Sequence, residues 1–490
     1  MITTLMIIVF VLGYMAIALE HSIKVDKAAS ALLIGGICWA LYAFTGVDAH
    51  HMNEHLAHHL VDIAEILFFL LGAMTIVELI DAHEGFSIIT DKITTNKKVI
   101  LMWILSIITF FFSAALDNLT TAIVMSALLT KLIKDREDLW MFAGMVILSA
   151  NAGGAWSPIG DITTIMLWIG GQVTASNIIT SVFIPSVVCA IVPLIYLTFK
   201  LKGDVTRPVK VESKEHYTDP TTPFERNLVF YMGVAGLLFV PVFKTVTHLP
   251  PYVGILLSLG VLWLVTEILH KSKNHEQKSQ LSVIGVLKKV DVPTIFFFLG
   301  ILLAVAALQS VGQLDIVAKF LDKTFNGDIY IINMIIGLLS SIVDNVPLVA
   351  GAMGMYHIIP DISQLLTVDS LLFIQTLNFE DIKLLVSENT ILSEDIIEKL
   401  KQLNIKEFEI IKNIEPSSLS NISNFNIDGK FWEFLAYCAG TGGSVLIIGS
   451  AAGVAVMGIL KIDFIWYLKN ISLLALMGYI AGAATYILMQ

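Results

Sequence analysis

The chain has 490 residues, of which 56% are hydrophobic and only 14% are charged, with a mean hydropathy of +0.80 and a net charge of −11. A soluble protein could not expose so apolar a surface to water without aggregating, so the composition excludes one and predicts an all-helical membrane protein. About ten or eleven segments approach the ~20 apolar residues that cross a hydrocarbon core of ~30 Å. Examples are Ile2 to Leu19, Ala28 to Thr45, Ile178 to Phe199 and Tyr252 to Leu269.

Basic residues predict the orientation of these segments, because Lys and Arg mark the cytoplasmic loops of membrane proteins with short loops. The first segment has no Lys or Arg ahead of it and is followed by Lys24 and Lys27, which is the reverse of a cleavable signal peptide. We therefore expect it to stay as a membrane helix. Further basic clusters lie near 92–98, 131–136, 200–210 and 271–289, whereas 46–59 and 170–177 contain none. This distribution predicts an N-terminus outside the cell, in a bacterial inner membrane.

The segment 46–59 is a predicted outside loop that is rich in histidine, at positions 50, 51, 55, 58 and 59. A solvated loop is the plainer interpretation, although an ordinary pKa of ~6.5 would let these side chains sense external pH. His55 and His59 have helical spacing that could hold a metal ion. Glu65 lies deeper in the next apolar segment, with His58 seven residues before it on the same helical face. We expect Glu65 and His58 to handle protons.

The 33 residues from Lys98 to Thr130 are nearly all apolar, and both ends are basic. As one helix they would be ~50 Å long, which exceeds the hydrocarbon core. They are therefore predicted to form a re-entrant hairpin that enters and leaves on the cytoplasmic side, with its tip near Ser113 to Asn118. Polar backbone at such a tip requires burial in protein or a water-filled cavity.

Three segments recur in the same order along the chain, which predicts two structural repeats. The basic loop before the second copy makes that copy run in the opposite direction, so the repeats are inverted. The matched pairs are Asp62-Ile-Ala-Glu-Ile-Leu-Phe-Phe-Leu with Asp291-Val-Pro-Thr-Ile-Phe-Phe-Phe-Leu, Ser113-x-x-x-Asp117-Asn118 with Ser340-x-x-x-Asp344-Asn345, and Asn151-Ala-Gly-Gly followed by Gly160-Asp161 with Gly440-Thr-Gly-Gly followed by Gly449-Ser450.

These repeats divide the chain into N-terminal membrane helices (1–60), repeat 1 (61–200, hairpin near 98–130), a cytoplasmic linker (201–222), linking helices with a cytoplasmic loop (223–289) and repeat 2 (290–490). Each repeat is predicted to contain a re-entrant hairpin and a broken helix. Repeat 2 also carries a polar, acidic, periplasmic insert at 357–430. We expect this insert to be a solvated appendage, because loop insertions are readily tolerated.

The glycine-rich segments 151–161 and 440–449 should break their helices, as happens at the ion sites of secondary transporters. Glycines that only permit close helix packing are the alternative interpretation. Acidic side chains in apolar segments are costly, which makes Asp117, Asp161 and Asp344 functional candidates. Capping of buried helix ends is the alternative for each of them.

Oxygen ligands suit a hard cation such as Na⁺ or Li⁺. The predicted first site combines hairpin and broken-helix residues, and the second is its counterpart in repeat 2. The first comprises Ser113, Asp117, Asn118, Thr121, Asn151 and Ser157, with Asp161, Thr163 and Thr164 adjacent. The second comprises Ser340, Asp344, Asn345, Thr441 and Ser444. The direct Na⁺ ligands are expected among Asp117, Asn118, Asn151, Asp344 and Asn345.

At these residues the sequence resembles the NhaD-type sodium/proton antiporters of the ion transporter superfamily. The segments that carry the likeness are Ser113-Ala-Ala-Leu-Asp-Asn-Leu-Thr-Thr121, Ser149-Ala-Asn-Ala-Gly-Gly-Ala-Trp-Ser-Pro-Ile-Gly-Asp-Ile-Thr-Thr164 and Ser341-Ile-Val-Asp-Asn-Val-Pro347. The resemblance implies a fold similar to that of divalent anion:sodium symporters and a homodimer in membrane lipid, without a nucleic-acid partner. It also implies efflux of Na⁺ or Li⁺ driven by H⁺ entry, with no cofactor besides the transported ions. The insert at 357–430 departs from the expected family pattern.

Two other classes of function were weighed. Transporters of dicarboxylates, citrate or arsenite in the same superfamily would need a cation beside the substrate, but 151–164 and 440–450 contain no Lys or Arg, and Asp occupies both hairpin tips. A membrane enzyme or scaffold would need a nucleophile or metal constellation, which the sequence does not contain. Cation antiport is therefore the favoured prediction.

Overall fold

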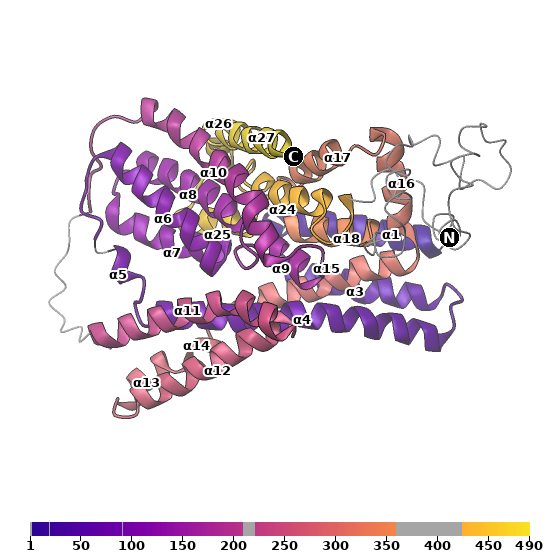
Figure 1. Cartoon of the computed structure of the whole chain (residues 1–490), viewed down its shortest axis with the longest axis horizontal. Helices are drawn as coiled ribbons and strands as arrows, with labels where there is room; N and C mark the ends of the chain where they lie inside the picture. The colour runs from indigo at the N-terminus through magenta and orange to yellow at the C-terminus, as the bar shows by residue number, and fades with distance from the viewer. Residues whose placement is uncertain (1, 19, 91, 209–220, 359–423) are drawn as a thin grey trace.

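The computed structural model describes the chain except residues 1, 19, 91, 209–220 and 359–423, and the described part is helical (Figure 1). Seven described helices are long and apolar enough to cross a membrane, namely α4 (Ala49–Ala82), α6 (Lys98–Leu116), α10 (Ala175–Lys200), α11 (Pro223–Thr247), α12 (Pro251–Leu269), α15 (Val292–Ser310) and α27 (Ser472–Met489). Five shorter apolar helices accompany them: α1 (Ile2–Ala18), α3 (Lys27–Ala43), α7 (Asn118–Leu132), α17 (Ile329–Leu339) and α18 (Asn345–Met355). The predicted all-helical membrane fold is confirmed.

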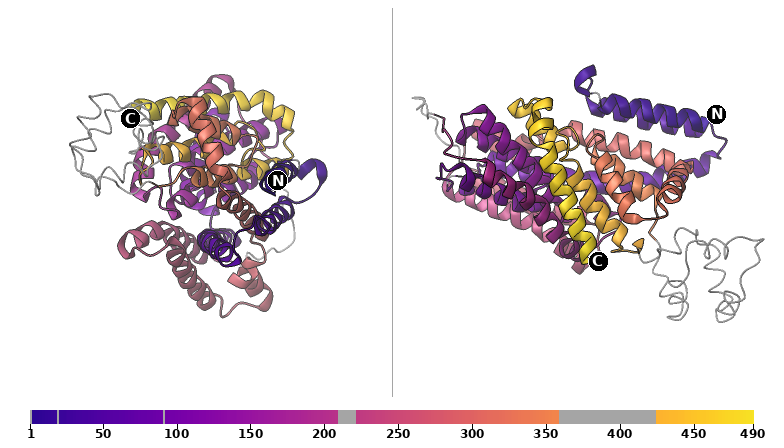
Figure 2. Two further views of the ribbon diagram at one scale, coloured as in Figure 1. Left: turned by 90° about the vertical axis from the view of Figure 1, so that its right-hand side faces the viewer. Right: turned by 90° about the horizontal axis from the view of Figure 1, so that it is seen from above.

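The helices form two groups that lie side by side (Figures 1 and 2). In the first group α3 packs against α1 and α15, while α4 packs against α11, α12 and α15. The second group contains α6, α7, α10, α17, α18 and α27 with α8 (Arg136–Ala155), α9 (Ile162–Ile169), α24 (Lys430–Gly442) and α25 (Ala451–Leu460). Contacts of α15 with α18 and of α4 with α9 join the two groups.

Short helices complete the described chain. They are α2 (Glu20–Ile23), α5 (Ser87–Thr90), α13 (His275–Leu281), α14 (Val283–Leu287), α16 (Gln313–Phe325) and α26 (Phe464–Asn470). The pair α25 and α26 bends by 117° at its break. This bent pair belongs to the second group, where α25 contacts α7 and α26 contacts α27.

Helix α4 corrects one expectation about the histidines. The predicted outside loop 46–59 is mostly helical, because α4 begins at Ala49 and has 34 residues, which makes it ~51 Å long. Asp48 caps it by accepting a hydrogen bond from the His50 backbone. The five histidines therefore lie on the first turns of a helix that runs without a break through the predicted boundary at 60/61. Side-chain polarity on these turns is compatible with a helix, because the helix satisfies its own backbone groups.

The segment from Lys98 to Thr130 forms a hairpin of α6 and α7 that pack against each other. Its two ends contact the same stretch of chain, since the Lys98 backbone N–H donates to Gly203 (3.1 Å) and that of Lys134 donates to Thr206 (2.8 Å). Both ends therefore lie on one side of the molecule, and the tip is at Asp117, where φ is 81°. Which side of the membrane this is stays a prediction.

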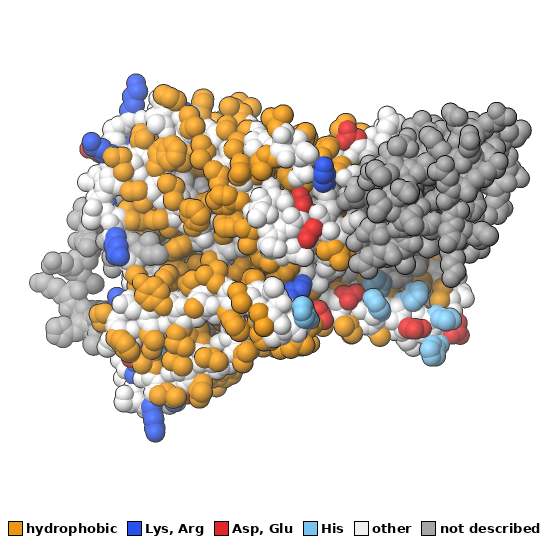
Figure 3. All heavy atoms as spheres, in the orientation of Figure 1, with side chains coloured by type: hydrophobic (Ala, Val, Ile, Leu, Met, Phe, Trp, Pro, Cys, Tyr) orange, Lys and Arg blue, Asp and Glu red, His pale blue; other side chains and the backbone are white. Residues whose placement is uncertain are grey.

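A broad band of hydrophobic side chains covers the visible face, with Lys and Arg gathered toward one end and His, Asp and Glu toward the other (Figure 3). The basic end contains the α6–α7 hairpin ends, and the opposite end contains the first turns of α4. Such an asymmetry is what a polytopic protein with a positive cytoplasmic side presents to the bilayer.

The predicted insert at 357–430 and the linker at 201–222 fall largely outside the described residues. Near the described end of the insert, Asp428 accepts hydrogen bonds from the Thr174 backbone (2.5 Å) and hydroxyl (2.8 Å). Thr174 belongs to the stretch 170–177, which the sequence also predicts to be outside. These two predicted outside segments therefore lie together.

Candidate ion-binding site

Two broken helices contribute the backbone of the candidate site. Helix α8 ends at Ala155 and α9 begins at Ile162, while α24 ends at Gly442 and α25 begins at Ala451. Both glycine-rich segments thus interrupt their helices as predicted. The alternative interpretation, close packing, is also met at these glycines.

Gly153 and Gly442 bring each broken helix into backbone contact with its hairpin. A Cβ on Gly153 would lie 2.1 Å from the carbonyl oxygen of Phe110 on α6. A Cβ on Gly442 would lie 1.9 Å from the carbonyl oxygen of Gly337 on α17. Any side chain at either position would therefore push the broken helix away from the hairpin.

Gly160 and Gly449 make the matching contact at the other end of each break. A Cβ on Gly160 would lie 2.9 Å from the carbonyl oxygen of Ser113, and one on Gly449 would lie 2.6 Å from that of Ser340. Ser113 and Ser340 are the paired serines of the two sequence copies. The two copies therefore make equivalent contacts, whereas their inverted relation stays a prediction.

Asp161 is the centre of a buried polar network. Its Oδ2 accepts a hydrogen bond from Asn118 Nδ2 at 2.6 Å, and its Oδ1 accepts from the backbone N–H and the hydroxyl of Thr163, both at 2.8 Å. Asn118 Nδ2 also donates to Asn151 Oδ1 at 3.0 Å. The Thr164 hydroxyl donates to the Asp161 carbonyl at 2.8 Å. The hairpin tip, α8 and α9 thus meet at one carboxylate that is only 1% exposed.

Asn151 connects this network to the second repeat. Its Nδ2 donates to Ser444 Oγ at 2.9 Å and to Ser450 Oγ at 3.0 Å. A Cβ on Gly440 would lie 3.9 Å from Asp161 Oδ2, so the α24 backbone passes beside the carboxylate. The network therefore contains one charged group and a set of amide and hydroxyl oxygens from both halves of the chain, a ligand set that suits a hard cation.

Ser113 and Ser157 fasten the hairpin to the break without joining the carboxylate network. Ser113 Oγ donates to the Ala150 carbonyl, and Ser157 Oγ donates to the Ala114 carbonyl, both at 2.5 Å. Both side chains are buried. These two hydrogen bonds hold α6 against α8 and against the α8–α9 connection.

Asp117 occupies the hairpin tip and caps α7. It accepts hydrogen bonds from the backbone N–H and the hydroxyl of Thr120, each at 2.8 Å. Capping is the alternative interpretation for Asp117, and the structure shows the capping hydrogen bond. One turn into α7, the buried hydroxyl of Thr121 finds no hydrogen-bond partner within the described part of the chain. An ion or a water molecule would satisfy that hydroxyl.

The predicted second site is less convergent. Ser340 Oγ donates to the Gly337 carbonyl (2.7 Å) and to the Ala439 carbonyl of α24 (3.2 Å). Thr441 Oγ1 donates to the Tyr437 carbonyl of its own helix (2.6 Å). Asn345 is buried at the start of α18. Asp344 caps that helix and forms an ion pair with Lys27.

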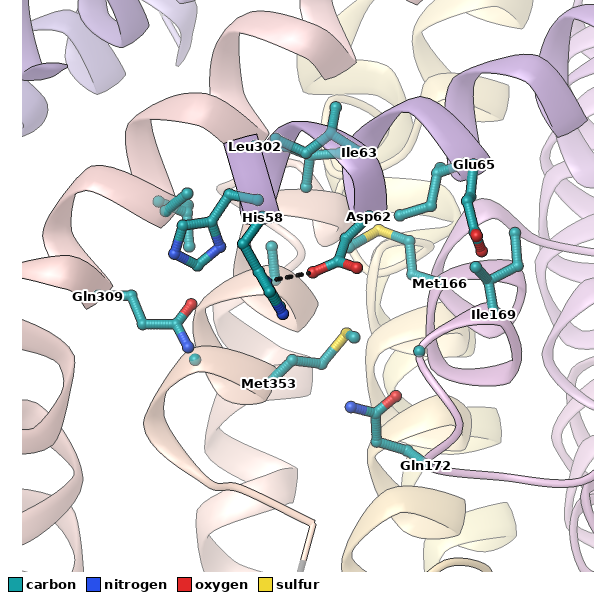
Figure 4. Close-up of a pocket in the computed structure, with 17 residues that line it drawn as sticks. His58, Asp62, Ile63, Glu65, Met166, Ile169, Gln172, Leu302, Gln309 and Met353 are labelled. Carbon is teal, nitrogen blue, oxygen red and sulfur yellow. Dashed lines mark ion pairs between the residues drawn. The ribbon is translucent and has the colours of Figure 1, made fainter. Parts of the chain in front are cut away.

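The proton-handling candidates line a separate cavity of about 350 Å³ between α4, α9, α15 and α18 (Figure 4). His58 Nδ1 lies 3.5 Å from Asp62 Oδ2, and both side chains are largely exposed, at 79% and 64%. Glu65 lies one turn deeper on the wall of the cavity, which also includes Met166 of α9. His58 and Glu65 therefore share a cavity, but they form no described contact with the Asp161 network, and their role in proton handling stays a prediction.

His55 and His59, the suggested metal pair, have different contacts from each other. The His55 ring hydrogen-bonds to the Tyr42 hydroxyl, and the His59 ring to the Ser310 hydroxyl, each at 3.3 Å. The donor atoms that lie within 4.8 Å of one another belong instead to His58, His59 and Asp62.

Sequence reasoning missed Ser450 and Lys27 as neighbours of the candidate residues. The repeat pattern could have indicated Ser450, because Ser450 and its counterpart Asp161 both follow a glycine at the end of the break. Ser450 has a hydroxyl group where Asp161 has a carboxylate, so the search for buried acidic side chains did not select it. Lys27 gave no signal, since it lies in a basic cluster far along the chain from Asp344.

Comparison with known proteins agrees with this geometry. Residues 3–377 match the family described as citrate transporter (CitMHS). The chain is 39% identical to sodium/proton antiporter 1 of Arabidopsis thaliana over 98% of this chain and 72% of that protein, and 37% identical to sodium/proton antiporter 2 of the same plant over 98% of each. It is 27% identical to the Na⁺/H⁺ antiporter NhaD of Vibrio cholerae over 99% of this chain and 91% of that protein. The chain therefore belongs to the CitMHS family and to the NhaD-type sodium/proton antiporters of the ion transporter superfamily.

Proposed function

We propose that this chain exchanges cytoplasmic Na⁺ or Li⁺ for external H⁺. The observation that carries the proposal is the buried Asp161 carboxylate, which accepts hydrogen bonds from Asn118 and Thr163. It belongs to an amide and hydroxyl network that reaches Ser444 and Ser450 of the second repeat through Asn151. The plant and bacterial relatives that align with nearly the whole chain are named as sodium/proton antiporters. Transport of this kind serves sodium and pH homeostasis.

Asn118 suggests how the ion enters. Its amide N–H now donates to Asp161, which places a partial positive charge where a cation would bind. Rotation of the Asn118 amide by a half turn would direct its oxygen, rather than its nitrogen, toward an incoming Na⁺. The ion would then replace one donor at the carboxylate and gain two oxygen ligands without a backbone movement.

Protons compete with Na⁺ because Asp161 is the one carboxylate in the described network. A bound proton removes the negative charge that holds the cation, and a bound cation disfavours protonation. Binding of one ion therefore releases the other, which is the coupling that antiport requires.

The family description raises a second candidate, a carrier of citrate or a related anion. A di- or tricarboxylate would need cationic groups at the binding site. None of the hydrogen bonds described for Asp161 and for the segments 151–164 and 440–450 involves a Lys or Arg. The charge of the site thus favours a cation.

The finer placement rests on sequence arguments. We propose an inner-membrane protein with its N-terminus outside and the hairpin ends of α6–α7 in the cytoplasm, assembled as a homodimer. The clustering of Lys and Arg at the end that contains these hairpin ends supports this orientation (Figure 3).

Everted membrane vesicles loaded with a pH-sensitive dye test the function directly. Addition of NaCl or LiCl should collapse a pre-formed proton gradient, whereas KCl, succinate and citrate should not. Asp161→Asn should remove the response, and Asp315→Asn, at an exposed carboxylate of α16, should keep it. A response to citrate but not to NaCl would establish the anion carrier instead.

A further inference from the structure

The carboxylate at the tip of the second hairpin, Asp344, forms an ion pair with a lysine side chain. Lys27 Nζ, at the start of α3, lies 3.6 Å from Asp344 Oδ2, at the start of α18. Their side chains are 21% and 15% exposed, so the pair is mostly removed from solvent. It connects the α3–α15 layer to the hairpin of the second repeat.

The ammonium group of Lys27 is held in place from the α3–α15 side. It lies 4.4 Å from the centroid of the Phe297 ring, a cation–π contact with α15. The Lys27 backbone N–H donates to Glu20 Oε1 at 3.4 Å. Lys27 is therefore positioned by helices outside the hairpin that it contacts.

The ion pair borders a cavity of about 50 Å³, which is lined by Tyr14, Glu20, Lys27 and Asp344 among others. A space of this size holds one or more waters, or an ion with part of its hydration shell. The titratable groups that face the pair from the neighbouring elements are Tyr14 of α1 and Glu20 of α2. Displacement of the ammonium group into this space would leave Asp344 free for another cation.

The first repeat has no equivalent of Lys27. Within the described residues, no Lys or Arg lies in ion-pair contact with Asp117 or Asp161, whose partners are Thr120, Thr163 and Asn118. Of the three candidate carboxylates, Asp344 is therefore the one that has an ion-pair partner in the described part of the chain.

We propose that Lys27 is a built-in competitor of Na⁺ at Asp344 and thereby sets the sodium affinity of the transporter. Two cations on one carboxylate repel each other, so Na⁺ gains Asp344 only when the Lys27 ammonium leaves it. The ion pair forms again when Na⁺ departs, which favours release. This inference rests on the proposed sodium/proton exchange and assigns Lys27 a role in its specificity.

Sodium titrations of vesicle exchange test the assignment by comparing wild type, Lys27→Gln, Asp344→Asn and the double variant, with Lys27→Arg and Lys98→Gln as controls. Lys27→Gln should lower the half-saturating Na⁺ concentration about tenfold, which corresponds to ~1.4 kcal/mol, and should slow the maximal rate. Lys27→Arg keeps the charge and should bind Na⁺ no more tightly than wild type. Combined with Asp344→Asn, Lys27→Gln should have no further effect on Na⁺ affinity. Lys98→Gln is the matched control, because Lys98 and Asp138 form an ion pair of similar exposure, 20% and 15%.

A direct measurement on the wild type avoids dependence on variant folding. Amine-reactive labelling of purified protein, read by mass spectrometry at Lys27, should increase in NaCl relative to choline chloride. Equal labelling in the two salts, or an unchanged Na⁺ affinity in an inserted Lys27→Gln protein, would overturn the competitor role while exchange by the wild type persists. A wild type without sodium-dependent proton movement would instead reject the proposed function.

Discussion

Protonation of a buried histidine pair is expected to limit the stability of the fold in acid. His83 and His270 follow directly after α4 and α12, and their Nε2 atoms lie 2.7 Å apart. The His83 Nδ1–H donates to the Leu79 carbonyl at 2.7 Å. His83 Nε2 must therefore accept the His270 Nε2–H, so the His83 ring is neutral. A further proton on His83 would make the two nitrogens face each other with a hydrogen on each.

The sign and size of the effect follow from burial. Both side chains are at most 1% exposed, and desolvation lowers the pKa of His83 from 6.5 to about 4 and also lowers that of His270. The unfolded chain takes up a proton near pH 6.5, while folded His83 stays neutral. Stability from this difference is fully present above pH ~6.5 and is lost as the pH falls toward ~4. At pH 5.5, one unit below the unfolded pKa, the loss is about 1.4 kcal/mol.

The perturbation is His83→Gln, whose side-chain oxygen accepts the same hydrogen bond and cannot ionise. Unfolding of detergent-purified protein, followed by tryptophan fluorescence, should show that wild type loses about 1.4 kcal/mol more than the variant between pH 7.5 and 5.5. His248→Gln, at an exposed histidine, should retain the wild-type pH dependence. Parallel loss of stability in wild type and His83→Gln would refute the reasoning, and a relative gain by wild type in acid would mean that the pair carries a proton.

Three further outcomes are expected for transport. Asp161→Asn and Asp117→Asn should each abolish exchange in properly inserted protein. Because Asn caps helices as well as Asp does, an unchanged melting temperature would show that the loss of exchange is due to the loss of charge. Normal exchange by purified Asp117→Asn would remove that residue from the site. The apparent Na⁺ affinity of the wild type, measured by sodium titration, should rise with pH until the carboxylate is fully ionised, and a constant affinity across that range would contradict competition for a shared group. Single cysteines at Lys97 and Lys134 should both be labelled from the cytoplasmic side by an impermeant thiol reagent, and labelling on opposite faces would make the segment an ordinary spanning helix.

The sequence alone determined that this is a membrane protein, and it predicted several of the helices and helix breaks. Apolar segments of membrane length can satisfy their backbone groups only as helices, so the all-helical fold follows from composition. The hairpin at 98–130 followed from an apolar stretch too long for one crossing with basic residues at both ends. Helix breaks at 151–161 and 440–449 followed from clustered glycines. The same reasoning failed at the first turns of α4, because side-chain polarity reports contact with water and does not report whether the backbone is helical.

Only the tertiary structure decided which polar groups meet. Asn118 contacts Asn151 and Asp161, which follow it by 33 and 43 positions in the sequence. Asn151 contacts Ser450, which follows Asn151 by 299 positions. Sequence reasoning gave Asp117 and Asp161 similar weight, and both cap the helix that follows them. Packing adds a hydrogen bond from the Asn118 amide to the Asp161 carboxylate. Pairing of Asp344 with Lys27 depends on how α3 lies against the second hairpin. Side-chain contacts of this kind arise from the relative placement of helices, which local periodicity and residue type do not encode.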